Sequence, residues 1–280
     1  MTTEVKKHLD NIRVAFIGCG VMAESIIAGL LRQKLVSPAQ IAGSHPRAAR
    51  REELEKRYGI RMVEKNRDAV EGGEIDIVVL AVKPQRLHVV LPELRGALSA
   101  DNLVLSIIAG ARIETIAKDL AHSTIVRAMP NTPAQIGEGI TVWTATPEVS
   151  EAQRDRIQTL LGALGREMSV ETERMIDMAT ALSATGPTYV FLVMEALVDA
   201  GVHMGFSRHV AQELVTQTIL GSVLFARESH KHPAELRNMV TSPGGTSAEA
   251  IYQMEKGSLR TVLSKAVYAA YQRAVTLGKG

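Results

Sequence analysis

Cysteine and aromatic residues are scarce in this chain of 280 residues. Cys19 is the single cysteine, so the chain has neither an internal disulfide framework nor a zinc site built from several cysteines, and a reducing compartment is indicated. Aromatic residues make up 4% of the chain and the net charge is only +2, with both signs mixed. Because nucleic-acid binding usually needs basic stripes and rings that stack on bases, we expect no nucleic-acid partner.

Long apolar runs and metal-ligand clusters are also lacking. No uninterrupted apolar run reaches the roughly 20 residues that span a bilayer, and residues 1–11 lack the apolar core of a signal peptide. We therefore expect a cytoplasmic protein without a membrane partner. No cysteine or carboxylate pair accompanies the histidines of the C-terminal half at ligand spacing, so we expect no metal site and surface positions for His203, His209, His230 and His232.

The first part of the chain alternates short β-branched runs with helical patterns. This alternation is typical of an α/β Rossmann domain with a parallel sheet, which we assign to residues 1–170. The hydrophobic content of 46% is that of a globular protein. Strands are expected at residues 13–17, 40–44, 61–63, 76–82, 102–108, 124–129 and 139–144, and helices near residues 21–33, 47–58, 84–95, 112–121 and 150–162.

The β pattern stops at about residue 171, and apolar residues then recur at helical spacing to the end of the chain. Residues 171–280 are therefore expected to form an all-α domain, with Pro187 near a helix start and Pro233 and Pro243 interrupting the later helices. Apolar side chains cover most faces of these helices, more than the core of one chain can enclose. We expect this domain to form a homodimer, or part of a larger homo-oligomer.

Residues 13–26 combine a β-like run, a Gly-x-Gly-x-x-Ala turn and an amphipathic helix, which is the dinucleotide-binding fingerprint. Gly18 provides the tight turn, Gly20 allows the backbone to approach a pyrophosphate, and Ala23 allows the helix to lie close to the strand. The free N–H groups at the helix start, around Val21 and Met22, are expected to bind the phosphates.

The end of the second expected strand favours NADPH over NADH. NAD-binding folds usually carry an acidic residue there for the adenosine ribose, whereas this chain has Ser44 and Arg47. A hydroxyl and a guanidinium suit a 2′-phosphate, so we predict that these two residues bind it. For Arg50 and Arg51 the solvated face of an ordinary helix is the favoured interpretation.

Five ordered segments resemble the signature motifs of the Δ1-pyrroline-5-carboxylate reductase family. The resemblance runs from the first strand to the last helix and implies a Rossmann domain, a helical dimerisation domain, a nicotinamide hydride donor and reduction of a cyclic imine to L-proline. The segments are 81–85 (Ala-Val-Lys-Pro-Gln), 106–110 (Ser-Ile-Ile-Ala-Gly), 127–133 (Arg-Ala-Met-Pro-Asn-Thr-Pro), 182–187 (Leu-Ser-Ala-Thr-Gly-Pro) and 241–248 (Thr-Ser-Pro-Gly-Gly-Thr-Ser-Ala).

Position by position, the resemblance implies a set of cofactor contacts at the ends of strands, where open α/β sheets bind ligands. Lys83 could be catalytic, but a structural or cofactor-side role is favoured. The expected cofactor-binding residues are Gly18, Cys19, Gly20, Val21, Met22, Ser44, Arg47, Asn66, Ala81, Val82, Lys83, Pro84, Ile107, Ile108 and Ala109.

The chain departs from the family pattern at a few positions. Val21 stands where Asn is commoner, Ser247 where Thr is usual, and residues 182–188 read Leu-Ser-Ala-Thr-Gly-Pro-Thr instead of Leu-Ser-Gly-Ser-Gly-Pro-Ala. All of these changes except that at Val21 keep a small or hydroxyl side chain. They therefore bear on the details of cofactor contact more than on the reaction.

Reduction of a cyclic imine needs a positioned hydride and a stabilised nitrogen rather than a strong base, whereas reduction to an alcohol needs a general acid for the developing alkoxide. Related hydroxyacid dehydrogenases commonly place a lysine on the first long helix of the second domain, and residues 186–195 contain none. A hydroxyacid dehydrogenase or another imine reductase is therefore the second choice. A non-catalytic, regulatory dinucleotide-binding protein is the third, and the complete 242–248 segment argues against it.

The glycine-rich segment before the penultimate helix is the expected substrate site. Its backbone N–H groups at a helix start suit a carboxylate, and Ser247 is expected to act in catalysis by hydrogen-bonding the ring nitrogen or the carboxylate. Ordinary N-capping by Thr246 and Ser247 is the competing interpretation. The residues assigned to substrate binding are Gly244, Gly245, Thr246, Ser247 and Glu173.

Overall fold

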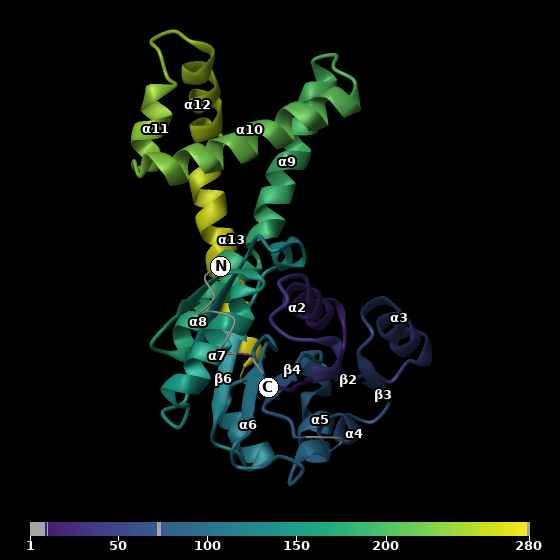
Figure 1. Ribbon diagram of the computed structural model, residues 1–280. Helices are drawn as coiled ribbons and strands as arrows, with labels where there is room; N and C mark the ends of the chain where they lie inside the picture. The colour runs from purple at the N-terminus through teal and green to yellow at the C-terminus, as the bar shows by residue number, and fades with distance from the viewer. Residues whose placement is uncertain (1–8, 10, 72–73, 279–280) are drawn as a thin grey trace. The chain divides into compact units, whose positions relative to one another are not determined.

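The computed structural model describes Leu9 and residues 11–71 and 74–278. The chain forms two compact units, one of residues Met1–Thr185 with Ala270–Gly280 and one of residues Gly186–Ala269 (Figure 1). The last helix of the chain thus begins in the second unit and ends in the first.

The first unit contains a sheet with the strand order β3-β2-β1-β4-β5-β6-β7-β8. The strands β1 to β6 run parallel, as expected for a Rossmann domain, and β7 runs antiparallel to β6. The bounds are β1 (Val14–Ile17), β2 (Ile41–Ser44), β3 (Arg61–Val63), β4 (Ile77–Leu80), β5 (Leu103–Ser106), β6 (Ile125–Met129), β7 (Gly139–Ala145) and β8 (Gly165–Ser169).

Two hydrophobic cores lie on opposite faces of this sheet, because successive side chains of a strand point to opposite sides. In β1, Val14 and Phe16 belong to one core, while Ala15 and Ile17 belong to the other. The first core includes residues of α2 (Val21–Arg32), α3 (Ala48–Tyr58) and α7 (Glu151–Gly162). The second includes residues of α4 (Asn66–Glu71), α5 (Leu87–Leu94) and α6 (Ile113–Leu120).

Three features of this unit differ from the sequence-based expectation. The edge strand β8 has the sequence Gly-Arg-Glu-Met-Ser, in which no apolar alternation marks a strand. The helix α4 has only six residues, too few to show a period. The reversal of β7 was not anticipated either, because side-chain periodicity carries no information about strand direction.

The C-terminal part is helical, as expected. After α8 (Glu173–Ala179) and a π-helical turn (Thr180–Ala184), the helices are α9 (Gly186–His203), α10 (Arg208–Ser229), α11 (Pro233–Met239), α12 (Thr246–Lys256) and α13 (Leu259–Leu277). Within the second unit, α9 and α10 approach so closely that a Cβ at Gly201 would lie 2.9 Å from Ala211 Cβ. In Figure 1, α9 lies near the N-terminal end of α10, and α11 and α12 lie near its C-terminal end.

This helical unit buries very little of its own apolar surface. Among its residues only Val198, Gly201 and Ala211 are buried. The helical stretch Glu173–His203 is long and apolar enough to cross a membrane, by length and composition only, and its most apolar 18 residues have a mean hydropathy of 1.4 and are 6% buried. Most of the large apolar side chains of α9 are thus exposed among the described residues, including Phe191 and Leu192.

Candidate active site

The carboxyl ends of five parallel strands lie side by side at one edge of the sheet. Ile17 at the end of β1 pairs with Ser44 and with Leu80, and Leu80 pairs with Ser106 at the end of β5. Ser44 also pairs with Val63 at the end of β3. The segments expected to bind the cofactor begin at these strand ends or directly after them. The fold therefore brings them to the edge where α/β sheets bind nucleotides.

The glycine turn between β1 and α2 has the conformation that its sequence predicts. Gly18 has φ +87°, and a Cβ there would lie 2.5 Å from Val82 Cγ1, so only glycine fits. Gly20 is the N-cap of α2, and no side chain caps this helix start. The N–H groups of the first helical turn have no intrahelical partners and are thus able to bind an anion.

Next to this turn lies a cavity of about 720 Å³ within the first unit. Its charged lining is mainly basic, with Lys65, Lys83 and Arg86 beside Arg47. The complete lining is Gly18, Gly20, His45, Pro46, Arg47, Glu64, Lys65, Asn66, Arg67, Ala81, Val82, Lys83, Arg86, Val90 and Glu93. A volume and charge of this kind suit the adenosine part of a phosphorylated dinucleotide.

Ser44 and Arg47 occupy different environments in this region. Ser44 is fully buried, and its hydroxyl donates to Asn66 Oδ1 at 2.7 Å and accepts from the Gly18 N–H at 3.3 Å. Arg47 is exposed and lines the cavity. Arg47 thus lies at the wall of the cavity, whereas the Ser44 hydroxyl holds the glycine turn and Asn66 in place.

Arg50 and Arg51 do not form a solvated helix face, contrary to the expectation. Their side chains are only 13% and 19% exposed, because each reaches back to a backbone carbonyl of a loop. Arg50 Nε donates to the Cys19 carbonyl at 3.3 Å, and Arg51 Nη1 donates to the His45 carbonyl at 2.8 Å. Both arginines therefore support the loops that border the cavity.

The other expected cofactor residues differ in exposure. Burial raises the pKa of the Cys19 thiol to about 12, so this side chain stays neutral inside the protein. Val21 is 62% exposed at the start of α2. Ile107 and Ile108, after β5, are buried, whereas Ala109 is partly buried. Lys83 is exposed and lines the cavity, and Pro84, which follows it, and Met22 on α2 are both partly buried.

Sequence reasoning missed His45 and Lys65, which also line the cavity. His45 Nδ1 accepts a hydrogen bond from the Arg47 N–H at 3.2 Å. Burial, and then the charge of Arg47, lowers the pKa of His45, so its ring is neutral near pH 7. The available signals were sequence neighbours, since His45 adjoins Ser44 and Lys65 adjoins Asn66, and both neighbours were expected contacts.

Glu173, assigned to substrate binding, belongs to a buried charge cluster in the first unit. Its Oε1 accepts from Arg127 Nη1 at 2.9 Å and from the Ile113 N–H at 3.0 Å. Arg127, only 2% exposed, also donates from Nη2 to Asp177 Oδ1 at 2.7 Å. These contacts tie α8 to β6, and the contact of Glu173 with substrate stays a prediction.

The loop before α12 has an uncapped helix start. Gly245 is the N-cap and no side chain caps it, so neither Thr246 nor Ser247 has the N-capping role that was the competing interpretation. Gly244 has φ +69°, a conformation that favours glycine. The N–H groups of Gly245 and Ala248 donate to the carbonyls of Ser242 and Gly245, which leaves those of Thr246 and Ser247 as the ones able to bind an anion.

Comparison with known proteins shows matches over both parts of the chain. Residues 13–110 match the family model described as NADP oxidoreductase, coenzyme F420-dependent, and residues 173–277 match that described as pyrroline-5-carboxylate reductase dimerisation. The pyrroline-5-carboxylate reductase of Synechocystis is 40% identical over 269 residues, which cover 96% of this chain and 99% of that protein. The chain belongs to the pyrroline-5-carboxylate reductase family. The resemblance inferred from the five motifs is thereby confirmed.

Solved structures of the pyrroline-5-carboxylate reductase family have the same fold. The pyrroline carboxylate reductase of Plasmodium falciparum, with NADP bound, has a TM-score of 0.88 and 30% identity, over 96% of this chain and 99% of that one. The enzyme of Coxiella burnetii has a TM-score of 0.87 and 36% identity over the same shares. A Rossmann domain followed by a helical domain is therefore the architecture that this chain shares with these relatives over nearly their full length.

Proposed function

We propose that this protein reduces 1-pyrroline-5-carboxylate to L-proline with NADPH, the final step of proline biosynthesis. The observation that carries the proposal is the 40% identity to a pyrroline-5-carboxylate reductase over 96% of the chain. The glycine turn, the uncapped start of α2 and the basic cavity at the sheet edge fit a dinucleotide. NADH is the alternative cofactor, because the same turn binds the pyrophosphate of either.

The chemistry needs little from the side chains. A nicotinamide cofactor held at this edge of the sheet would supply the hydride for the imine carbon, and the nitrogen would keep or take up a proton to become the amine. The protein has to bind the carboxylate, orient the ring and stabilise the nitrogen. We assign the carboxylate to the Thr246 and Ser247 N–H groups, which Gly244 and Gly245 precede, and the nitrogen contact to the Ser247 hydroxyl. Glu173 stays a predicted substrate contact of the first unit.

NADPH preference is supported by the surroundings of Arg47. Arg47 lines the cavity and makes no ion pair among the described residues, and Lys65 and Lys83 add positive charge there. The acidic residue that typically selects NADH is replaced by Ser44. Arg47 is therefore the main contact for the 2′-phosphate, and Ser44 supports it by fixing Asn66 and Gly18.

Purified protein tests the function directly. Addition of pyrroline-5-carboxylate should cause oxidation of NADPH, whereas addition of 2-keto acids should not. 3-Hydroxy acids should not reduce NADP⁺. Turnover of the hydroxy acids alone would instead establish a hydroxyacid dehydrogenase. Tight dinucleotide binding without turnover of any of these compounds would establish the regulatory alternative.

The helical unit supports a homodimer, because it matches the dimerisation model and leaves its apolar side chains uncovered. A second copy of this chain is the occupant that explains the exposed apolar face of Glu173–His203 without a membrane. A cytoplasmic location is part of the same proposal and is supported by the single buried, unpaired cysteine.

A further inference from the structure

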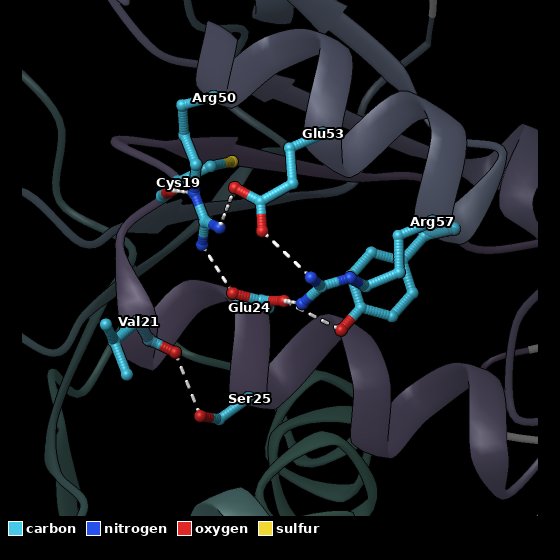
Figure 2. A network of polar contacts seen from close by, with 8 residues as sticks. Cys19, Val21, Glu24, Ser25, Arg50, Glu53 and Arg57 are labelled. Carbon is cyan, nitrogen blue, oxygen red and sulfur yellow. Dashed lines mark hydrogen bonds and ion pairs between the residues drawn. The ribbon is translucent and has the colours of Figure 1, made fainter.

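Arg50, on α3, reaches across to the glycine turn that precedes α2. Figure 2 shows its guanidinium between the Cys19 carbonyl and the carboxylates of Glu24 and Glu53. Nε donates to Cys19 O at 3.3 Å, Nη1 to Glu53 Oε2 at 2.8 Å, and Nη2 to Glu24 Oε2. A planar guanidinium can donate in three directions at once, which an ammonium on a flexible stem does not do in a fixed geometry.

The contact with Cys19 holds the middle of the turn. Cys19 lies between Gly18 and Gly20, the two residues with the greatest backbone freedom in the segment. Its N–H donates to the Ser44 carbonyl at 2.9 Å, and its carbonyl is held by Arg50. Both polar groups of this residue are thus anchored, so the direction in which the chain enters α2 is fixed before any ligand binds.

Arg50 also balances a carboxylate placed beside the expected pyrophosphate. Glu24 lies in the first turn of α2, where a negative charge stabilises the helix but repels a phosphate at the same end. Burial raises the pKa of Glu24, but hydrogen bonds from Arg50 and Tyr58 outweigh this effect and bring the pKa below its usual value. The carboxylate is therefore charged at neutral pH and needs the charge of Arg50 when an anion binds nearby.

Arg57 provides a natural comparison on the same helix. Its Nη1 donates to Glu24 Oε1 at 2.6 Å and its Nη2 to Glu53 Oε1 at 2.9 Å, so it pairs with the same two carboxylates (Figure 2). Its side chain is 53% exposed, against 13% for Arg50. Unlike Arg50, it has no hydrogen bond to the glycine turn among the described residues.

We propose that Arg50 is a positioning residue of the dinucleotide site, which orients the glycine turn through the Cys19 carbonyl and neutralises Glu24 beside the pyrophosphate. The inference rests on the proposed function, since it concerns the cofactor of that reaction. The pyrophosphate is common to both nicotinamide cofactors, so Arg50 contributes equally to NADPH and NADH. Arg47, in contrast, discriminates between them.

The test compares Arg50→Met with Arg57→Met in the full-length protein, by titration calorimetry with NADP⁺ and with NAD⁺ and by steady-state kinetics. Arg50→Met removes hydrogen bonds from a charged donor, so the affinities for both cofactors should fall by the same factor, about ten-fold or more. Its kcat at saturating NADPH should stay within about two-fold of the wild-type value, because the chemical step is not touched. Arg57→Met should keep both affinities within about two-fold, as exposed ion pairs contribute little.

Two further variants separate the contact from the charge. In Arg50→Met/Glu24→Gln the repulsion is gone but the carbonyl contact is still missing, so both cofactors should stay at least about five-fold weaker than in the wild type. In Arg50→Lys the positive charge remains, the fold is kept and binding of both cofactors should still weaken.

Several results would overturn the inference. Unchanged cofactor affinity in Arg50→Met, or full recovery of affinity in the double variant, would contradict it. So would a loss of affinity in Arg50→Met that is confined to NADPH. A lower kcat of Arg50→Met with unchanged KM would also contradict it, because it indicates only a smaller folded fraction. If Arg50→Met does not fold, Arg50→Lys decides: wild-type affinity for both cofactors contradicts a positioning role. A wild-type protein that binds neither dinucleotide would instead contradict the proposed function.

Discussion

At the scale of single residues, the strand-end positions were predictable and their contacts were not. The Gly-x-Gly-x-x-Ala spacing predicted Gly18 at a tight turn, and the structure shows it at φ +87°. The sequence could not show that Arg50 and Arg51 return to loop carbonyls, because hydrogen bonds to a backbone of distant sequence leave no periodic pattern. The basic cavity residues Lys65 and Arg86 were also missed, because they lie just outside the motifs and positions on which the prediction rested.

Replacing Arg47 with Ala should reduce NADPH affinity about ten-fold to a hundred-fold, because a charge-assisted contact with the 2′-phosphate is lost. NADH, which lacks this phosphate, should be nearly unaffected. Steady-state KM values for both cofactors check the prediction. Equal effects on the KM values for NADPH and NADH would show that Arg47 does not select between the two cofactors.

Ser247→Ala tests the substrate hydroxyl at the start of α12. Because Ser247 does not cap the helix, the variant should keep its stability and its backbone N–H groups. We expect kcat to fall about ten-fold or more with a smaller change in KM, if the hydrogen bond strengthens as charge leaves the nitrogen. The control is the thermal unfolding midpoint. Unchanged kcat and kcat/KM with pyrroline-5-carboxylate would exclude a catalytic role for the hydroxyl.

At the scale of secondary-structure elements, strongly patterned segments were predicted well. The seven expected strands all have counterparts, since buried parallel strands form continuous β-branched runs such as Ile77–Leu80. β8 was missed because this edge strand carries Arg166 and Glu167. The hydrophobic pattern also does not predict where two elements approach closely, because a glycine, which has no side chain, allows such an approach.

The crossing of α2 and α7 is one such approach. A Cβ at Gly29 would lie 2.7 Å from the Ala163 carbonyl oxygen, whereas one at Gly162 would have no neighbour within 4 Å. Gly29→Ala should therefore destabilise the protein by about 1–3 kcal/mol through overpacking, although alanine favours a helix. Gly162→Ala should be neutral or stabilise by up to about 1 kcal/mol.

Urea unfolding followed by the fluorescence of the single tryptophan measures both changes, because Trp143 is buried in the first unit. Equal stability of the two variants would show that α2 moves away from α7 without cost. A shift of α2 would also displace the glycine turn, so the KM for the cofactor is a second readout of Gly29→Ala.

At the scale of the whole molecule, the two parts of the chain differ in how completely they bury apolar residues. The sheet of the first unit has buried cores on both faces. Among the described residues, 20 of the 27 exposed large hydrophobic side chains lie between Gly186 and Ala269, where only three residues are buried. So small a core contributes little stability, which together with the match to the dimerisation model favours a covering partner.

We therefore expect the protein to sediment as a dimer or larger assembly at micromolar concentration, with no folded monomer. Two variants test this, Phe191→Asp on α9 and Val223→Asp on α10, and each changes a side chain that is 61% exposed in the single chain. Both should weaken assembly and lower the stability of the protein, because an unpaired charge buried in the interface costs several kcal/mol. Ile136→Asp is the matched control, since Ile136 is 73% exposed but lies outside the segment that matches the dimerisation model. It should leave the sedimentation coefficient unchanged. A well-folded, fully active wild-type monomer would contradict the prediction, because the apolar helices would then need no second copy to cover them.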